Sequence, residues 1–402
     1  MDFASALHQL KRSADQVQRD NELSSNGSKR QREDIKVGKA YMESEALKSL
    51  RGKINSLESH VDRFGADDKE ANVVSPPNAA GRHVCLLFIT IDDLPHENIW
   101  REFIENSNVS NDQELTVSVL VHAKFPFRVR SQWLRDHLLL SKSHRPDWGS
   151  VEITRAMIDL LEEGMKGSQR FIVRRNTETS LEDSEESIQG NDKITDKSHT
   201  QKQSTPPDKF VFLSESCLPI CSLCEMAISL YSENSRSSWM YALNAPNNGY
   251  AQQLQWDKVG QAISKEKIWK ADQWIVLSRY HASLILDIPE KLGGLSLWPQ
   301  FQFTRASDEL YFPTALGLLG FLKKENLEKD ANDILRRRVT YCDWSAGAKN
   351  PATFTGFDGL KHGYLQGRES GCLFARKFDS TPISVSDWKS LVLNDMKDSE
   401  VR

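Results

Sequence analysis

The sequence predicts an α/β fold, in which a mixed, mostly parallel sheet is flanked by helices. Apolar runs of strand length, such as His83–Ile91 and Leu115–Ala123, alternate with segments whose apolar residues have helical spacing. The run from His83 is apolar at nearly every position, as expected for a strand that is buried on both faces of a sheet. Strands that alternate with helices in this rhythm favour a sheet dominated by parallel pairs.

The first half of the chain supplies the expected helices. One follows from Pro95, a second is indicated by apolar residues with helical spacing between Ile153 and Met165, and Arg170–Val173 then starts a further extended segment. The apolar faces consist of Ile99, Trp100, Phe103 and Ile104 in the first helix, and of Ile153, Met157, Leu160, Leu161 and Met165 in the second.

Composition narrows the class of protein. The chain has 402 residues, 39% of them hydrophobic, and a formal net charge of −4. This charge argues against a general nucleic-acid interface, so no nucleic-acid partner is expected. No apolar run reaches the ~18 residues of a membrane span, and no signal peptide is visible, so we expect a soluble chain or one whose anchor lies outside this sequence.

The pattern along the chain predicts one large domain with polar attachments. Residues 1–80 are polar and predict a stem region, within which 47–64 forms a short coiled coil that would allow homo-oligomers. Residues 81–392 form the main domain, 174–208 are a disordered insertion because they contain almost no large apolar side chains, and 393–402 are a tail. The heptad seam consists of Leu47, Leu50, Ile54, Leu57, Val61 and Phe64.

The segment Phe210-Val-Phe-Leu-Ser-Glu-Ser-Cys predicts a buried strand that ends in polar groups. Phe210–Leu213 would be a central strand, and Ser214–Ser216 the polar turn at its carboxyl end. Cys217 is interpreted as a packed thiol of this turn. A zinc site made of Cys217, Cys221 and Cys224 is a weaker alternative, since no histidine accompanies the three thiols.

Charged and aromatic residues follow several strand-like runs of the second half, where open α/β sheets bind their ligands. Ser307 is positioned to cap a helix from Asp308, so Glu309 is either a catalytic carboxylate or an ordinary first-turn acid. Arg376–Lys377 would hold an anion or simply close a strand. Asp343-Trp344-Ser345 would be a turn or a ligand platform. Trp148 and Trp274 offer stacking faces, unless they only fill space.

Several catalytic signatures are missing from the sequence. It contains no glycine-rich phosphate loop, no Gly-x-Ser-x-Gly and no His-Glu-x-x-His. It also lacks an Asp-x-Asp triplet that could share a divalent cation, and the adjacent Asp92 and Asp93 are expected on opposite sides of a strand. A phosphate leaving group would therefore need protein cations to neutralise its charge.

These segments together resemble the core-2/I-branching β-1,6-N-acetylglucosaminyltransferase family, in particular its plant and algal group. The resemblance spans about residues 82–380, and it depends on the combination of blocks rather than on any one of them. The matching blocks, in the order of the family, are Val84–Thr90, Val119–Ala123, Asp147–Ser150, Phe210–Pro219, Trp269–Trp274, Ser307–Glu309, Val339–Ser345 and Leu373–Phe378.

The resemblance implies a GT-A-type fold and an inverting transfer, without a metal or other cofactor, of a sugar from a nucleotide donor, UDP-N-acetylglucosamine, to a glycan or glycoprotein hydroxyl. Glu309 corresponds to the base that deprotonates the acceptor. Lys377, with Arg376 beside it, corresponds to the cations on the donor diphosphate. A further cation maps best onto Arg337, although Arg338 is one position away. Other residues expected to line the site are His122, Trp148, Ser214, Glu215, Trp274, Asp308, Asp343 and Trp344.

The chain departs from the family pattern in one block. The usual Trp-Arg-Lys-Gly-Ser-Gln-Trp is shortened to Trp269-Lys-Ala-Asp-Gln-Trp274, on the side where relatives bind the acceptor. A catalytically inactive glycan- or partner-binding protein that keeps the fold is therefore the alternative. The family also implies the Golgi or secretory pathway and type II membrane anchoring. Because no anchor is present here, the sequence is expected to be an incomplete gene product or a soluble divergent form.

Overall fold

A computed structural model of the chain describes residues 48–55, 82–106, 115–139, 144–167, 172–173, 206–232, 236–244, 259, 262–323, 333–345 and 350–393. Of the predicted coiled coil 47–64, only 48–55 is described, and it is helical. The rest of the predicted stem, nearly all of the 174–208 segment and the end from 394 lie outside the described residues. These predictions of domain organisation therefore stay predictions.

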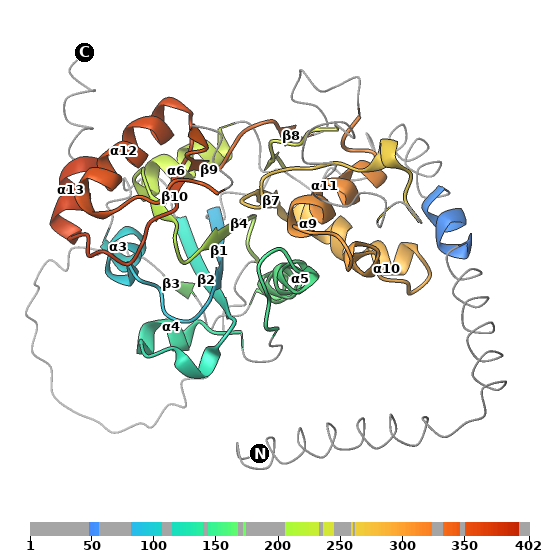
Figure 1. Cartoon of the computed structure of the whole chain (residues 1–402), viewed down its shortest axis with the longest axis horizontal. Coiled ribbons are helices and arrows are strands. Elements are labelled where there is room, and N and C mark those ends of the chain that lie inside the picture. The colour runs from blue at the N-terminus through green and yellow to red at the C-terminus, as the bar shows by residue number, and fades with distance from the viewer. Residues whose placement is uncertain are drawn as a thin grey trace, which may run out of the picture. The chain divides into compact units, whose positions relative to one another are not determined.

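The fold is built on a mixed sheet with seven strands in the described ranges (Figure 1). Its strands, in spatial order, are β3 (Ile172–Val173), β2 (Leu115–Ala123), β1 (Arg82–Thr90), β4 (Lys209–Ser214), β7 (Val276–Ser278), β6 (Ser238–Trp239) and β8 (Ile334–Leu335).

The long strands at the centre of the sheet are parallel, and antiparallel pairs occur among the short ones. β1 pairs in parallel with β2 and with β4, whereas β3 is antiparallel to β2, and β7 is antiparallel to both β4 and β6. The short strands β6 and β8 are again parallel. The predicted mixed, mostly parallel sheet is thus confirmed, and the structure is compatible with a GT-A-like fold.

Both faces of the central strands are covered, as their continuous apolar sequence requires. In β1, Val84, Leu86 and Phe88 point into the large apolar cluster on one face, while Cys85 faces helix α5 on the other. α5 (Val151–Met165) approaches the sheet closely at Gly164, where a Cβ atom would lie 2.9 Å from the Phe210 ring. The absence of a side chain at this position therefore sets the helix-to-sheet distance.

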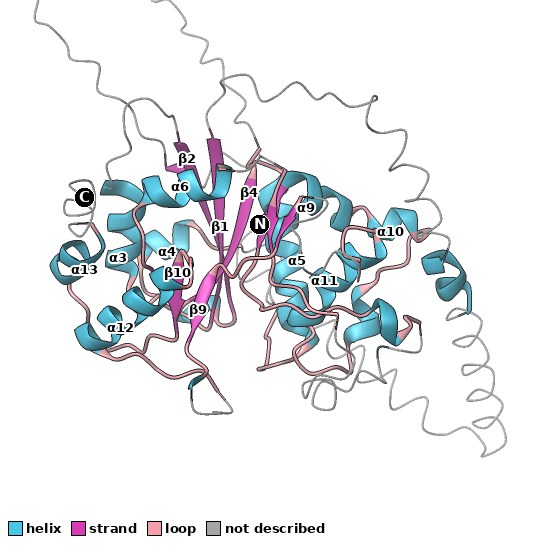
Figure 2. Ribbon diagram, turned by 90° about the horizontal axis from the view of Figure 1, so that it is seen from above, coloured by secondary structure: helices cyan, strands magenta, loops and turns pink. Residues whose placement is uncertain are grey.

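The helices form two groups, one on each side of the sheet (Figures 1 and 2). α3, α6, α12 and α13 lie together on one side, and α5, α9, α10 and α11 on the other. None of the helices in the described ranges is both long and apolar enough to cross a membrane. The remaining bounds are α3 (Glu97–Arg101, continued by a π-helical turn Glu102–Asn106), α4 (Gln132–Asp136), α6 (Leu223–Tyr231), α9 (Arg279–Leu286), α10 (Ile288–Lys291), α11 (Asp308–Leu318), α12 (Gly356–Glu369) and α13 (Val385–Val392), with 3-10 turns Pro126–Arg128, Lys265–Lys267 and Trp298–Phe301.

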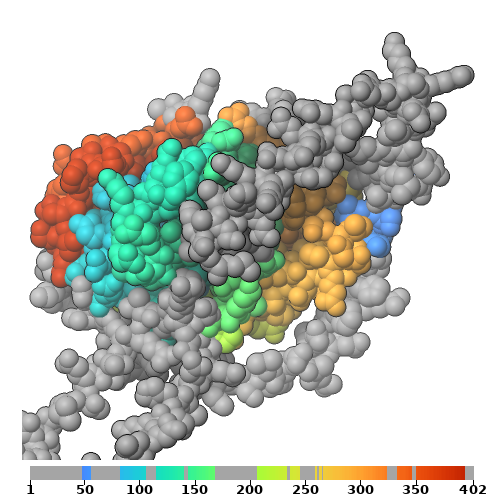
Figure 3. Space-filling model, turned by 90° about the horizontal axis from the view of Figure 1, so that it is seen from below, coloured from blue at the N-terminus to red at the C-terminus, as the bar shows by residue number. Residues whose placement is uncertain are grey.

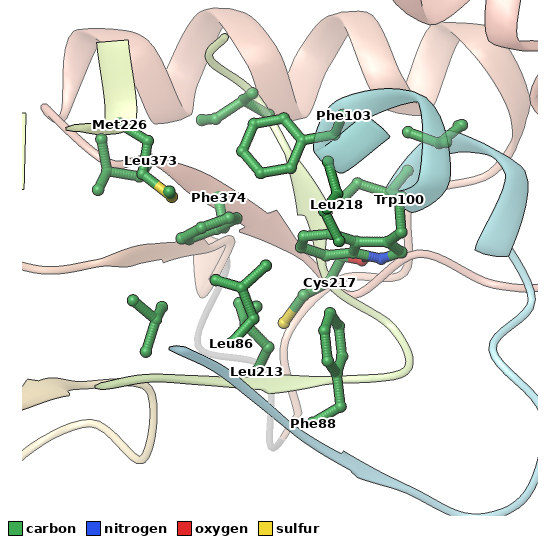
Figure 4. Packing of buried hydrophobic residues seen from close by; sticks show 14 of the residues in the cluster. Leu86, Phe88, Trp100, Phe103, Leu213, Cys217, Leu218, Met226, Leu373 and Phe374 are labelled. Atoms are coloured by element: carbon green, nitrogen blue, oxygen red, sulfur yellow. Dashed lines mark hydrogen bonds between the residues drawn. The ribbon is translucent and has the colours of Figure 1, made fainter. Parts of the chain in front are cut away.

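The core on the α3 side is aromatic (Figure 4). The Phe88 and Trp100 rings meet edge to face with 4.8 Å between their centroids, and Phe103 packs against Trp100 in the same way. The Trp100 indole N–H donates to the carbonyl of Cys217, so the one polar atom of this ring is satisfied. The predicted inward face of the first helix is confirmed, because all four of its apolar residues are buried.

A second, three-stranded sheet attaches the C-terminal segment to the carboxyl end of β4. Its strands are β5 (Leu218–Pro219), β10 (Phe374–Arg376) and β9 (Thr340–Cys342), with β10 in the middle. The Phe378 N–H donates to the carbonyl of Ser216, which ties the residues after β10 to the polar turn after β4. The C-terminal helices, red in Figure 3, and the elements of residues 262–320, orange, appear on opposite sides of the green and teal segments.

Two local predictions are wrong. Ser307 precedes α11 as expected, but its hydroxyl does not cap the helix and instead lies 2.7 Å from Thr154 Oγ1 of α5. Asp92 and Asp93 do not belong to a strand, because β1 ends at Thr90, and the Asp93 carboxylate is paired with an arginine of another loop. In both cases a tertiary contact replaces the local geometry that the sequence suggested.

Candidate active site

The candidate site lies at the carboxyl edge of β1, β2 and β4. Because Ile89 of β1 pairs with His122 on one side and with Ser214 on the other, the three strands end at the same level. Trp274 lies beside the same end of β4, since it stands two residues before the start of the antiparallel strand β7. This edge is where open α/β sheets bind their ligands.

Asp308 and Glu309 form the first turn of α11, whose Phe312 ring packs against Phe212 of β4, with 5.5 Å between centroids. The Glu309 side chain is 26% exposed, and its Oε2 lies 2.9 Å from Lys270 Nζ in an ion pair. Asp308 is buried, and its Oδ1 has no hydrogen-bond partner within the described ranges. The two carboxyl groups therefore differ in access, and only Glu309 faces a cation directly.

Burial makes both carboxyl groups more basic. Burial, together with the neighbouring Glu309, raises the pKa of Asp308 to about 7, against the opposing charges of Lys270 and Arg376. Burial also raises the pKa of Glu309, while the ion pair with Lys270 holds it down and Asp272 adds to the rise. A raised pKa makes a carboxylate a stronger base, which suits it to general-base catalysis.

Residues 269–274, called the 269–274 segment below, reach this site with alternate side chains. The first of these side chains is a cation that pairs with the Glu309 carboxylate, the second is a carboxylate that pairs with an arginine, and the third is an aromatic ring that lies under another arginine. The three contacts are Lys270 with Glu309 (2.9 Å), Asp272 Oδ2 with Arg338 Nε (3.1 Å), and the Trp274 ring with the Arg376 guanidinium (4.6 Å to the ring centroid).

The intervening residues anchor the segment, because Trp269 and Ala271 are buried. The Ala271 N–H donates to the carbonyl of Glu309 at 2.9 Å, so the segment is tied directly to α11. The Trp269 ring packs on Gly317 of the same helix so closely that a Cβ atom there would lie 2.4 Å from Trp269 Cδ1. The backbone thus fixes where the alternate side chains point.

Arg376, the last residue of β10, joins the segment to the turn after β4. Its guanidinium lies over the Trp274 ring and has an Nη atom 3.5 Å from Ser216 Oγ. Its partner in the neighbouring strand β9 is Cys342, with which its side chain also forms a hydrogen bond. Arg376 forms no ion pair with a carboxylate among the described residues, so its charge is available to an anion.

Lys377 and Glu215 lie near the same guanidinium. Burial raises the pKa of Glu215, and the charges of Arg376 and Lys377 oppose that rise. Lys377 is exposed, and in the part of the chain that is described its ammonium group has no carboxylate partner. Ser214 is buried below this turn, with its hydroxyl 3.0 Å from Ser216 Oγ.

The third predicted cation is Arg337, with Arg338 as the alternative one position away. The Arg337 guanidinium lies over the buried Trp239 ring, 5.4 Å from its centroid, and the neighbouring Arg338 pairs with Asp272 of the 269–274 segment. The contacts therefore connect Arg338, one position from the residue that the resemblance favoured, with the surroundings of Glu309.

Trp148 reaches the loop that leads into α11. Its ring is 72% exposed and lies under the Arg305 guanidinium, 4.1 Å away. The neighbouring Gly149 carbonyl accepts a hydrogen bond from the Ala306 N–H, and the Ala306 carbonyl accepts one from the Glu309 N–H. Trp148 is therefore on the same side of the molecule as the start of α11, but no contact with the site carboxylates is recorded.

His122 belongs to a separate polar cluster at the end of β2. Its Nε2 accepts a hydrogen bond from the His144 N–H at 3.1 Å, and burial together with His144 lowers its pKa to about 4. The His144 ring lies between Glu152 and Asp159 of α5, at 3.1 and 2.5 Å. These contacts hold the loop before α5 and explain His122 as a buried neutral histidine.

Asp343 and Trp344 follow β9, and the contacts of Asp343 within the described ranges are with its own turn and with α12. The Asp343 carboxylate accepts the Ser345 N–H at 2.8 Å, which lowers its pKa, and its other oxygen lies 3.3 Å from His362 of α12. Trp344 is 45% exposed. Asp343 thus stabilises a turn, in agreement with the first of its two predicted interpretations.

The cysteines are packed thiols. Cys217 and Cys221 are buried, the Cys217 sulfur accepts the Ser214 N–H at 3.4 Å, and the Cys221 thiol donates to the Leu373 carbonyl. Across the described ranges, no three His, Cys, Asp or Glu side chains form a group that could hold a metal ion. The interpretation of Cys217 as a packed thiol is confirmed, and the three-cysteine zinc alternative is not supported.

The sequence did not predict Lys270, Asp272, Ser216 or Cys342 as site residues, although all four contact the predicted ones. For Lys270 and Asp272 a signal existed, because charged residues alternate with small or apolar ones between two tryptophans, as in an extended segment with one buried face. Their partners could not be read in the same way, since Glu309 and Arg338 are distant in sequence.

A helix-borne carboxylate facing cations at the carboxyl edge of a mixed α/β sheet defines a class of group-transfer site, and comparison with known families identifies it. Residues 199–367 match the family model described as Core-2/I-Branching enzyme. No curated protein matches the chain. Residues 199–367 are therefore similar to the core-2/I-branching family, which is a family of glycosyltransferases of the N-acetylglucosaminyltransferase kind. Such enzymes act on a nucleotide-sugar donor and a glycan acceptor and typically reside in the Golgi.

Proposed function

We propose that the protein is an inverting, metal-independent glycosyltransferase that transfers N-acetylglucosamine from UDP-N-acetylglucosamine to a hydroxyl of a glycan or glycoprotein. The observation that carries this proposal is the position of the partly buried Glu309 carboxylate near the Arg376 guanidinium, which Lys377 follows in the chain. Within the described ranges neither cation forms an ion pair with a carboxylate, and both oppose the raised pKa of Glu215. One group can accept a proton while the others receive negative charge.

In this mechanism Glu309 removes the proton from the acceptor hydroxyl as its oxygen attacks the anomeric carbon. The bond from that carbon to the diphosphate oxygen breaks in the same step, so the configuration inverts and UDP leaves with the bonding electrons. General-base assistance of this kind contributes about 10²–10⁴-fold to the rate.

The leaving diphosphate is stabilised by Lys377 and Arg376, with Arg338 favoured over Arg337 as the third cation. Fixed cations at the position where charge develops lower the barrier without rearranging during the reaction. Arg376 is already oriented by the Trp274 ring and by Ser216, so little freedom is lost when it binds an anion.

The test measures transfer from UDP-N-acetylglucosamine in EDTA, and UDP affinity by titration calorimetry, for the wild type, Lys377→Ala and the matched surface variant Lys361→Ala. We expect activity that persists in EDTA. Loss of one charge-assisted contact to the diphosphate should weaken UDP binding about 10- to 100-fold in Lys377→Ala only. Activity abolished by the chelator would contradict metal independence. Equal UDP affinities of Lys377→Ala and Lys361→Ala would contradict the proposed role of Lys377 in binding the diphosphate.

The rival function is a catalytically inactive glycan-binding protein. It is favoured by one observation: Glu309 and Arg338 are both already neutralised by the 269–274 segment, in the block that departs from the family pattern. In that case the wild type would show neither transfer nor UDP binding that depends on Lys377.

We also propose residence in the Golgi or secretory pathway with type II anchoring, supported by the usual location of the family, and self-association through residues 47–64. Co-localisation of the tagged protein with Golgi markers tests the first proposal. Sedimentation of the chain with and without residues 1–80 tests the second.

A further inference from the structure

One cation of the proposed donor clamp is already occupied by a carboxylate of the protein. Asp272 Oδ2 lies 3.1 Å from Arg338 Nε, and the two side chains are 39% and 52% exposed. An exposed pair of this kind is only weakly stable, because water competes for both partners. A ligand that reaches the site can therefore displace one member of the pair.

We propose that Asp272 is an affinity-determining residue of the donor site, whose carboxylate holds Arg338 when no donor is bound and is displaced by the donor diphosphate. This inference rests on the proposed function, because it takes Arg338 as part of the diphosphate clamp. Asp272 does not contact the reacting atoms, so it acts through Arg338 and is not a catalytic residue.

The direction of displacement follows from how the two partners are held. Asp272 belongs to the 269–274 segment, whose buried residue Ala271 is bonded to the Glu309 carbonyl, so its backbone cannot follow a moving guanidinium. Arg338 carries a long side chain that lies over the Tyr241 ring, 4.8 Å from its centroid. The arginine can therefore turn on this ring toward a phosphate, leaving Asp272 in water.

The charge balance determines which ligands achieve this exchange. A guanidinium binds carboxylate and phosphate oxygens in the same forked geometry, so the two compete for the same donors. Asp272 offers a single negative charge. A nucleoside monophosphate offers about −1.5 to −2 on one phosphate, and a diphosphate offers a larger charge spread over two phosphates. The pair should thus favour nucleoside diphosphates over nucleoside monophosphates, whose single phosphate gains less by replacing the carboxylate.

No other carboxylate among the described residues of the site is positioned to pair with Arg338 in place of Asp272. Of the other carboxylates of the site, Asp308 and Glu309 belong to the head of α11, where Lys270 is bound to Glu309. Glu215 lies near Arg376 and Lys377. The next cation, Arg376, stacks on Trp274 rather than on an acid. Among the described residues, Asp272 is therefore the carboxylate whose removal changes the charge available at Arg338.

The experiment titrates the full chain with UDP and UMP at low and high salt, for the wild type, Asp272→Asn and Glu290→Gln. Glu290→Gln is the matched control, because it removes an exposed carboxylate from α10. Losing one exposed ion pair predicts UDP binding that is about two- to five-fold tighter in Asp272→Asn and unchanged in Glu290→Gln. The gain should shrink at high salt, and the ratio of UDP to UMP affinity should fall.

A double-mutant cycle separates this role from a structural one. In the Arg338→Ala background, adding Asp272→Asn should change UDP affinity no further, because the carboxylate then has no cation to occupy. UDP binding to Asp272→Asn that equals or is weaker than wild type would overturn the inference. If Lys377→Ala still loses UDP in that case, the proposed function stands. An unchanged UDP-to-UMP ratio would overturn the selection for diphosphates, and a wild type that does not bind UDP would overturn both proposals.

Discussion

The two ends of strand β4 both hold buried ionisable groups, but only one end has the properties of a site. At the amino end, Lys209 is fully buried, and its ammonium donates to the Ser237 carbonyl. Next to it, His281 Nδ1 lies 2.7 Å from Ser238 Oγ. Burial lowers the pKa of Lys209 to about 8 and that of His281 to about 3. These groups form hydrogen bonds with a buried carbonyl and a buried hydroxyl, which a ligand cannot displace.

At the carboxyl end the ionisable groups form ion pairs with partly exposed side chains, which a ligand can displace. Glu309 is 26% exposed and faces Lys270, and Arg338 is half exposed and faces Asp272. Perturbed pKa values occur at both ends, so they do not identify the site by themselves. Partial exposure and a replaceable partner distinguish a group that can react from one that stabilises the fold.

The largest expected effect tests the carboxyl end directly. Glu309→Gln keeps the shape of the side chain but cannot accept a proton, so transfer should fall about 10²–10⁴-fold. UDP affinity and the far-UV circular dichroism spectrum should stay within error of wild type. Transfer rates measured under saturating donor and acceptor check this, and a variant with wild-type turnover would place the base elsewhere.

A smaller effect is expected from the partner of the base. The ion pair with Lys270 holds down the pKa of Glu309, which burial raises. The base is active when ionised, so activity is lost as pH falls through this pKa. Lys270→Ala removes the cation and should move the acid limb of the pH–rate profile to higher pH, with an effect that shrinks at alkaline pH. A limb that stays in place, or moves to lower pH, would contradict this assignment.

At the amino end we expect no effect on chemistry and a clear effect on stability. Lys209→Ala leaves a cavity and an unpaired Ser237 carbonyl, which should lower the free energy of unfolding by about 2–4 kcal/mol. Turnover at a temperature where the variant is folded should equal that of wild type. The matched exposed variant Lys361→Ala should change neither quantity, and reduced turnover in Lys209→Ala would break the contrast between the two ends.

The same residue predicts a pH dependence of stability. Because the pKa of Lys209 falls from 10.5 to about 8 on folding, the unfolded chain binds more protons between these pH values. The contribution of Lys209 to stability therefore rises with pH across this window, and Lys209→Ala should lack that rise. Urea unfolding at several alkaline pH values measures the difference.

Much of the scaffold could be predicted from local pattern. The run Leu115–Ala123 is β2 as expected, Phe210–Leu213 lies within β4, and α11 begins at Asp308. Strands buried on both faces must be apolar throughout, and this requirement shows in the sequence of each strand separately. The position of Glu309 at the head of a helix is likewise a local property.

The errors arose where a distant residue competed with a local partner. Ser307 was expected to cap α11, but Thr154 of α5 takes its hydroxyl. The choice between Arg337 and Arg338 as a donor cation is a different case and stays a prediction, although Arg338 is the one that pairs with Asp272 of the 269–274 segment. A shift of one residue reverses the direction of a side chain on extended backbone, so sequence register alone could not decide between the two arginines.

The sequence alone determined the α/β class, the order of the strands along the chain, the resemblance to a family and the residue types available for catalysis, because each depends on short-range pattern. Only the tertiary structure decided which charges meet. Lys270, Asp272 and Trp274 are neighbours in sequence, yet their partners Glu309, Arg338 and Arg376 come from three separate elements. Electrostatic interaction depends on distance in space and on burial, and the fold sets both.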